Sequence, residues 1–171
     1  MNVVLVGYRG TGKSAVARAL GARLGWPVAS TDALVEKRIG CTIADFVAEH
    51  GWPAFRAVER DAVVVVAQRR HVVIDTGGGA VLDPIAREAL RASGLVVWLR
   101  ATPATIAERI RGDVRRPPLR PGQSTESEIV AVLAEREPVY EAVAHVEIHT
   151  DEGSVADIAA RIDALLQTHH T

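Results

Sequence analysis

Short apolar runs alternate along this chain with longer segments in which apolar residues recur at helical spacing. The apolar runs cover residues 3–6, 28–30, 72–75, 95–99 and 143–148. Short runs that are apolar throughout are typical of strands covered by helices on both faces, as in a parallel sheet. The pattern therefore predicts a three-layer α/β fold with a five-stranded parallel sheet, one strand for each run.

The segments between the runs supply the expected helices, for example at residues 14–24 and 154–166. In the second of these, Val155, Ile158 and Ile162 recur at helical spacing, with charged residues between them. This spacing predicts a helix that packs on the sheet. The 171 residues suit a single domain that spans the whole chain and has one sizeable core.

Composition and charge narrow the class of protein. Lys and Arg total 20 against 21 Asp and Glu, and the resulting charge of −1 gives no indication of a nucleic acid or an anionic membrane as partner. No run approaches the roughly 18 apolar residues of a bilayer span, and the first run lacks the basic residues of a signal peptide. We therefore expect a cytoplasmic protein. The single cysteine, Cys41, excludes an internal disulfide and a C-x-x-C site, and we expect it to be buried.

The first predicted strand leads directly into the sequence GYRGTGKS at residues 7–14, which fits the phosphate-binding pattern G-x-x-x-x-G-K-[ST]. Its glycines let the backbone curl so that N–H groups face phosphate oxygens, and the following helix presents its positive end to the same anions. Lys13 can reach the β- and γ-phosphates, and the Ser14 hydroxyl can bind Mg²⁺. The predicted ATP-binding residues of this P-loop are Gly10, Thr11, Gly12, Lys13 and Ser14. The motif indicates a nucleotide but does not identify the phosphoryl acceptor.

Residues 112–122 interrupt the alternation of strands and helices with three prolines, two glycines and three arginines. This composition excludes a regular helix or strand, and a surface loop of this length is uncommon unless it is functional or disordered. The arginines favour a phosphate-facing lid, at about residues 112–123, over an idle surface loop.

Four further features follow the P-loop in order along the chain. They are Asp32 after the second apolar run, FRAVE at residues 55–59, TGGG at residues 76–79 and REPVY at residues 136–140. Together with the P-loop and the sequence RPPL at residues 116–119, they resemble the shikimate kinase family from residue 3 to about residue 150. Many protein families share the P-loop, whereas the triple glycine with F-R-x-x-E and R-E-P-x-Y is specific to this one.

The resemblance implies the strand arrangement of the nucleoside-monophosphate kinases and a small-molecule kinase that acts as a monomer. Its reaction would be ATP plus shikimate giving ADP plus 3-phosphoshikimate, a step towards chorismate and the aromatic amino acids, with Mg²⁺ as cofactor. Two alternatives remain open. One is a kinase of another small carboxylic or sugar acid, and the other is a nucleotide-binding protein that does not transfer phosphate.

The resemblance also implies roles for individual residues. Asp32 would bind the acceptor hydroxyls and take the proton, although an aspartate at this position could instead cap the following helix. Arg56 and Arg136 would clamp the substrate carboxylate, because a guanidinium fork binds a carboxylate bidentately. Glu59, three residues after Arg56, would hold that arginine from the same helical face.

Glycines and further arginines complete the site that the resemblance implies. The glycines expected to let the backbone approach the substrate ring are Gly77, Gly78 and Gly79. Arg116 would be the lid arginine that stabilises charge during phosphoryl transfer, with Arg115 and Arg120 as close competitors for that role. Either Arg109 or Arg111 would stack on adenine, and the sequence does not choose between them.

The chain departs from the family pattern at the end of the second predicted strand. The family carries D-x-D there, whereas this chain has Ser30-Thr31-Asp32, so it lacks the first aspartate, which helps to hold Mg²⁺. Asp75 ends the third predicted strand, where many P-loop proteins keep a metal-binding aspartate. We therefore hypothesise that the metal carboxylate has moved from position 30 to Asp75, which requires the two strand ends to be neighbours facing the P-loop. Alternatively, Asp75 caps a turn and Ser30 is a tolerated variant.

Overall fold

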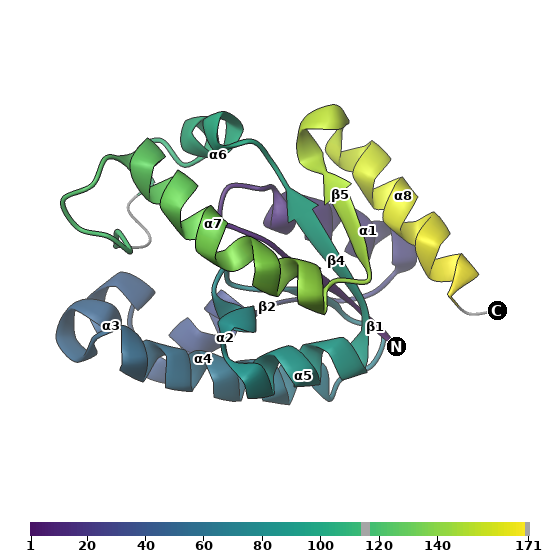
Figure 1. Cartoon of the computed structure of the whole chain (residues 1–171). Coiled ribbons are helices and arrows are strands. Elements are labelled where there is room, and N and C mark those ends of the chain that lie inside the picture. The colour runs from purple at the N-terminus through teal and green to yellow at the C-terminus, as the bar shows by residue number, and fades with distance from the viewer. Residues whose placement is uncertain (114–116, 170–171) are drawn as a thin grey trace.

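The structure, a computed structural model, describes residues 1–113 and 117–169 (Figure 1). Its strands form one parallel sheet of five in the order β2-β3-β1-β4-β5. The strands are β1 (Asn2–Val6), β2 (Val28–Ser30), β3 (Val73–Asp75), β4 (Gly94–Arg100) and β5 (Val146–His149). The predicted α/β fold with a five-stranded parallel sheet is thereby confirmed.

Helices cover both faces of this sheet (Figure 1). Helices α1 and α8 pack on one face, and α4, α5 and α7 pack on the other. The described helices are α1 (Lys13–Leu24), α2 (Thr31–Ile39), α3 (Ile43–His50), α4 (Trp52–Ala67), α5 (Pro84–Ser93), α6 (Pro103–Arg109), α7 (Thr125–Val143) and α8 (Val155–Thr168), with 3₁₀ turns η1 (Ala80–Leu82) and η2 (Thr150–Glu152). None of these helices has the length and apolar character needed to cross a membrane.

Strand β1 lies at the centre of the sheet and is fully buried along its length. Val3 and Leu5 belong to the apolar cluster under α1 and α8, whereas Val4 and Val6 belong to the cluster under α4, α5 and α7. Successive side chains of a strand point to opposite faces, so a strand covered on both faces must be apolar at every position. This is the physical reason for the unbroken apolar run before the P-loop.

Two expectations from the sequence were wrong in detail. The fifth strand begins at Val146 and not at Val143, which ends α7. Val143 is apolar because it packs in the cluster under α7, and Val146 is apolar because it packs against the cluster on the other face of the sheet, so hydrophobicity does not mark the end of the helix. Cys41 is exposed and not buried; it lies just after Gly40, the residue that ends α2 in the left-handed conformation with φ 73°.

His145 connects the end of α7 to strand β4 through two hydrogen bonds. Its backbone N–H donates to the carbonyl of Val96 at 2.9 Å, and its Nδ1 accepts from the N–H of Val96 at 3.0 Å. An accepting ring nitrogen carries no proton, so this contact requires the neutral imidazole. Partial burial of the ring, followed by the charges of Arg91 and His169, lowers the pKa of His145 below its usual 6.5.

The lowered pKa of His145 predicts a loss of stability in mild acid. Below about pH 6.5 the unfolded chain binds a proton at this residue before the folded chain does. The contribution of neutral His145 to stability is therefore present above that pH and is lost as the pH falls through the lower pKa of the folded state. In thermal melts, His145→Asn should show a smaller fall in Tm between neutral and mildly acidic pH than the unsubstituted protein. Val65→Ala, which changes an exposed position of α4 that carries no titratable group, should keep the original pH profile; equal profiles for all three proteins would contradict this prediction.

Candidate active site

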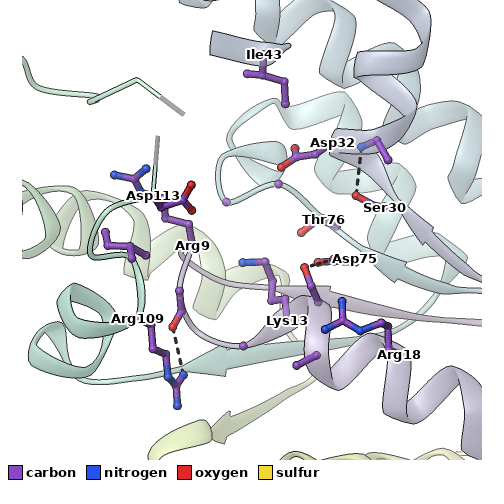
Figure 2. A pocket seen from close by; sticks show the side chains of 18 of the residues that line it. Arg9, Lys13, Arg18, Ser30, Asp32, Ile43, Asp75, Thr76, Arg109 and Asp113 are labelled. Atoms are coloured by element: carbon purple, nitrogen blue, oxygen red, sulfur yellow. Dashed lines mark hydrogen bonds between the residues drawn. The ribbon is translucent and has the colours of Figure 1, made fainter. Parts of the chain in front are cut away.

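A cavity of about 530 Å³ opens at the carboxyl ends of the strands, above the P-loop (Figure 2). Ligands of open α/β sheets bind at this edge. Residues from β2, β3, the P-loop and the segments that follow them converge on it, including Lys13, Ser14, Ser30, Asp32, Asp75 and Gly77. The structure therefore brings Lys13 and Ser14 of the P-loop to the same place as the predicted metal carboxylate Asp75.

The P-loop needs its glycines for two different reasons. Gly7, Gly10 and Gly12 have φ angles of 143°, 79° and 93°, a region that side chains rarely adopt. In addition, a Cβ on Gly7 would lie 2.4 Å from the carbonyl oxygen of Leu99, and a Cβ on Gly10 would lie 2.6 Å from a methyl carbon of Ile110. The curl that results leads into α1, whose first turn has no acidic residue. The positive end of this helix is therefore suited to binding an anion.

Lys13 and Thr11 use their side chains differently within the loop. The Lys13 ammonium donates to the carbonyls of Gly7 and Tyr8 at 2.8 and 2.9 Å, and the side chain points into the cavity (Figure 2). Thr11 is only 1% exposed, and its hydroxyl donates to the Tyr8 carbonyl at 2.8 Å. Of the predicted ATP-binding residues, Thr11 does not line the cavity, because its hydroxyl is turned inward to hold the loop.

The two strand ends singled out by the sequence are neighbours. Strands β2 and β3 pair in parallel with Ser30 opposite Asp75, and both residues line the cavity. The Ser14 hydroxyl of the P-loop donates to Asp75 Oδ2 at 2.6 Å. Burial raises the pKa of Asp75, while the charge of Lys13 and the Ser14 hydrogen bond act in the opposite direction. The geometric condition of the relocation hypothesis is therefore met: the carboxylate of Asp75 stands beside the hydroxyl that P-loops use for Mg²⁺.

Asp32 points into the cavity and does not cap α2 (Figure 2). The N-cap is Ser30, whose hydroxyl accepts from the N–H of Ala33 at 3.2 Å. Asp32 lies in the first turn of the helix, where the positive end favours a negative charge. The alternative role considered for Asp32, that of the helix cap, was wrong.

The triple-glycine loop is held in place from two sides. The Gly77 N–H donates to the hydroxyl of Thr31 at 2.9 Å, and the hydroxyl of Tyr140 donates to the carbonyl of Gly78 at 2.5 Å. Tyr140 is fully buried. The sequence did not indicate a role for Thr31 or Tyr140. Thr31 lies in the S-T-D sequence at residues 30–32, and Tyr140 is the last residue of the R-E-P-x-Y motif.

Arg56 and Arg136 flank consecutive glycines of this loop. A Cβ on Gly79 would lie 2.3 Å from Nη1 of Arg56, and one on Gly78 would lie 3.4 Å from Nη1 of Arg136. The pairing of Arg56 with Glu59 is confirmed, at 2.6 Å, and Glu59 is only 2% exposed. The structure therefore brings both predicted clamp arginines to the same side of the molecule, at the loop next to the P-loop cavity.

A narrow second cavity of about 10 Å³ lies beside Arg136. Arg9, Gly78 and Trp52 also line it, and Pro117 and Leu119 of the predicted lid contribute to its wall. The N–H of Leu119 donates to the buried carboxylate of Glu128 at 2.7 Å, which anchors this part of the lid to α7.

Not every lid residue of the prediction can be placed. Arg116, the predicted lid arginine, and its neighbour Arg115 lie outside the described residues. Arg120, the third candidate, pairs with Glu135 on α7. The second half of the predicted lid is therefore attached to α7, and its Pro117 and Leu119 share the narrow cavity with Gly78.

Arg109 is placed between the P-loop and the turn after β5. Its Nη1 donates to the carbonyl of Gly10 at 3.2 Å and to the hydroxyl of Thr150 at 3.1 Å, and it lines the large cavity. Arg111 is not among the described residues that line this cavity. The geometry therefore favours Arg109 over Arg111 as the arginine beside the nucleotide, and it adds Thr150, which the sequence did not indicate.

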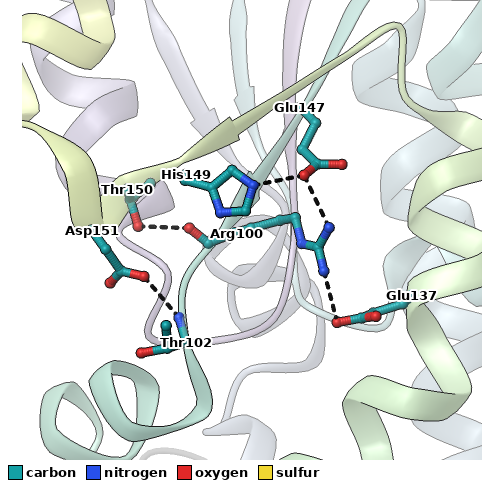
Figure 3. Close-up of polar contacts among 7 residues, drawn as sticks. All are labelled: Arg100, Thr102, Glu137, Glu147, His149, Thr150 and Asp151. Carbon is teal, nitrogen blue, oxygen red and sulfur yellow. Dashed lines mark hydrogen bonds and ion pairs between the residues drawn. The ribbon is translucent and has the colours of Figure 1, made fainter.

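A polar network fixes the turn that carries Thr150 (Figure 3). The Thr150 hydroxyl donates to the carbonyl of Arg100 at 3.0 Å, and the Asp151 carboxylate accepts from the N–H of Thr102 at 2.9 Å. The guanidinium of Arg100 pairs with Glu147 at 2.9 Å and Glu137 at 3.2 Å. The ends of β4 and β5 are thus joined next to the nucleotide cavity.

Comparison with known proteins agrees with this geometry. The family model described as shikimate kinase matches residues 9–167. A shikimate kinase of Symbiobacterium thermophilum is 46% identical over 98% of this chain and 97% of the relative, and one of Nitratidesulfovibrio vulgaris is 45% identical over 96% and 94%. The solved structure of shikimate kinase from Acinetobacter baumannii in complex with shikimate has a TM-score of 0.93 at 33% identity, covering 98% of this chain and 93% of that one. On the cavity, the motifs and these similarities, the chain belongs to the shikimate kinase family.

Proposed function

We propose that this protein transfers the γ-phosphoryl group of ATP to a hydroxyl group of shikimate, giving ADP and 3-phosphoshikimate. The observation that carries the proposal is the placement of Arg56 and Arg136 against Gly79 and Gly78, at the loop that borders the P-loop cavity. Two guanidinium groups suit an acceptor with a carboxylate, and the related Acinetobacter baumannii structure contains shikimate. The enzyme is, in this proposal, a single domain that acts as a monomer in the cytoplasm.

The nucleotide occupies the large cavity in this proposal. Backbone N–H groups of the P-loop and the first turn of α1 hold the phosphates, and Lys13 contributes its charge at the β- and γ-phosphates. Gly10, Gly12 and Ser14 border this space. The base lies towards Arg109, which Thr150 and the Gly10 carbonyl orient.

The acceptor lies between the glycine loop and Asp32. Arg56 and Arg136 hold its carboxylate, and the backbone of residues 77–79 approaches its ring closely because there is no side chain in the way. Asp32 accepts a hydrogen bond from the reacting hydroxyl, orients its oxygen towards the γ-phosphorus and takes its proton. Glu59 keeps Arg56 in place.

The residues at the end of β3 fit a Mg²⁺ ion. A buried carboxylate whose ionisation is disfavoured by burial, hydrogen-bonded to the P-loop serine, is suited to a hard cation. Mg²⁺ usually keeps several waters and binds phosphate oxygens of the substrate, so one carboxylate and one hydroxyl are sufficient protein ligands. Ser14 and Asp75 would hold the ion, and it would neutralise charge on the β- and γ-phosphates.

The lid, at about residues 112–123, closes over both substrates in this proposal. Its second half is already anchored through Leu119 to Glu128. Closure excludes water, which would otherwise accept the phosphoryl group, and Arg116 would add positive charge at the phosphates.

The reaction is tested by ADP release with shikimate as the variable component. We expect turnover that requires ATP, Mg²⁺ and shikimate together, and no comparable turnover with gluconate, because the glycine loop and two arginines match a cyclic carboxylic acid. Turnover with a different acid and not with shikimate would replace the proposed acceptor. Nucleotide binding without turnover would support the alternative of a nucleotide-binding protein that does not transfer phosphate.

The metal role of Asp75 is tested by exchanging charges between the two strand ends. Asp75→Asn should raise the Mg²⁺ concentration for half-maximal activity by roughly tenfold, because a carboxylate next to the ion is lost. The double variant Ser30→Asp with Asp75→Asn should restore most of the Mg²⁺ affinity, since the two positions are opposite each other in the sheet.

A carboxylate elsewhere in the cavity provides the matched control. Asp113 lines the same cavity on the side away from Asp75 (Figure 2). Asp113→Asn should keep the original Mg²⁺ requirement. If Asp75→Asn also keeps it, Asp75 is not the metal carboxylate and only caps the turn.

The glycine loop is tested by adding one methyl group. The Cβ of Gly79→Ala would overlap the Arg56 guanidinium, which must then leave its position. Gly79 has a φ of −102°, so alanine fits the backbone and the fold should be retained. The KM for shikimate should rise by about tenfold or more, while the KM for ATP changes little. Gly153→Ala is the control, because its Cβ would have only an ordinary contact at 3.6 Å; equal KM values for both variants would contradict the arginine clamp.

A further inference from the structure

We propose that Arg9 contacts the phosphoryl group while it passes from the nucleotide to the acceptor, and that it is a catalytic residue of this chain. The inference rests on the proposed function. Arg9 occupies one of the four variable positions of the P-loop pattern, so the motif itself gives it no role.

Arg9 borders both cavities of the site. It lines the large cavity together with Lys13 and Asp75, and it lines the narrow cavity together with Gly78 and Arg136. Its backbone nitrogen is 3.4 Å from the position of a Cβ on Gly78. Because the phosphoryl group must travel from the P-loop side to the glycine-loop side, a residue that borders both lies next to its path.

The charge of Arg9 is not committed to a carboxylate. Among residues 1–113 and 117–169, the ion pairs of the structure do not include Arg9. By contrast, Arg56 pairs with Glu59, and Arg109 donates to Gly10 and Thr150. The Arg9 guanidinium, which lies beside the side chain of Tyr8, can therefore serve an incoming anion without breaking an ion pair between described residues.

During the transfer, the phosphoryl group carries negative charge that the Arg9 guanidinium can stabilise. The acceptor oxygen forms a bond to the γ-phosphorus, the bond from phosphorus to the bridging oxygen breaks with its electrons on ADP, and the hydroxyl proton passes to Asp32. Negative charge is spread over the three equatorial oxygens of the moving group in the transition state. The Lys13 ammonium donates to two carbonyls of the P-loop, whereas Arg9 also borders the narrow cavity next to Arg136, a proposed ligand of the acceptor. A planar guanidinium there stabilises the group midway between donor and acceptor.

The test compares Arg9→Met and Arg9→Lys with the unsubstituted full-length protein. Arg9→Met should lower kcat by about 100-fold, with KM values for ATP and shikimate within about threefold of the original. Arg9→Lys should recover part of the loss, because it restores the charge but not the planar fork. Arg38→Met, which removes a surface arginine of α2, is the control and should keep kcat and both KM values.

A binding measurement separates a catalytic role from a structural one. Aluminium fluoride with MgADP and shikimate imitates the phosphoryl group in transit, so its complex should be weakened in Arg9→Met by a factor similar to the loss of kcat. Binding of MgADP alone should be unchanged, and Tm should stay the same. A raised KM for shikimate with unchanged kcat would instead assign Arg9 to acceptor binding, and unchanged kinetics would make it an idle surface residue; either result overturns the inference.

Different results would contradict the proposed kinase activity and the proposed role of Arg9. Turnover of shikimate by the unsubstituted protein tests the proposed function before any variant is made. If that turnover is present and Arg9→Met keeps it, only the role of Arg9 is wrong. If the unsubstituted protein does not phosphorylate shikimate, both proposals fall.

Discussion

The central position of strand β1 is the constraint on which the site depends. It is hydrogen-bonded to β3 on one side and to β4 on the other, and it is fully buried. The loop that leaves its carboxyl end must therefore emerge between the ends of these two neighbours. Gly7 passes against the Leu99 carbonyl at the end of β4, and Ser14 meets Asp75 at the end of β3. The order of the strands thus determines which residues surround the P-loop.

The same strand order explains how a charge can change its position in the sequence without leaving the site. In parallel strands that pair in register, residues opposite each other lie at the same height above the sheet. Ser30 and Asp75 are such a pair, at the edge that faces the P-loop. In the proposed function, a carboxylate at either position serves the metal ion beside the Ser14 hydroxyl, and a serine at the other position can have a separate role. Here Ser30 caps α2.

Local patterns predicted the fold and the P-loop well, because both depend on short stretches of chain. A buried strand shows its apolar run directly, and the curl of the P-loop needs glycine at particular positions. Contacts between distant segments could not be read in this way. Tyr140 binds the carbonyl of Gly78 across 62 residues, and Arg109 binds Thr150 across 41. Each of these side chains is an ordinary residue in its own segment, and only the packing of α7 and the turn after β5 against the strand ends gives it a role.

The buried positive charges beside the two cavities favour anionic ligands. The chain as a whole is nearly neutral, yet Lys13 and Arg136 are each only 7% exposed beside the cavities. Burial of cations is costly unless charge or hydrogen bonds compensate for it. Carbonyl groups of the P-loop partly compensate Lys13. Phosphates on one side and a carboxylate on the other would complete the compensation, so binding of the two substrates should also stabilise the folded protein. In the proposed function, the positive groups are therefore a preorganised receptor, and the free-energy cost of their burial is offset when both anions are bound.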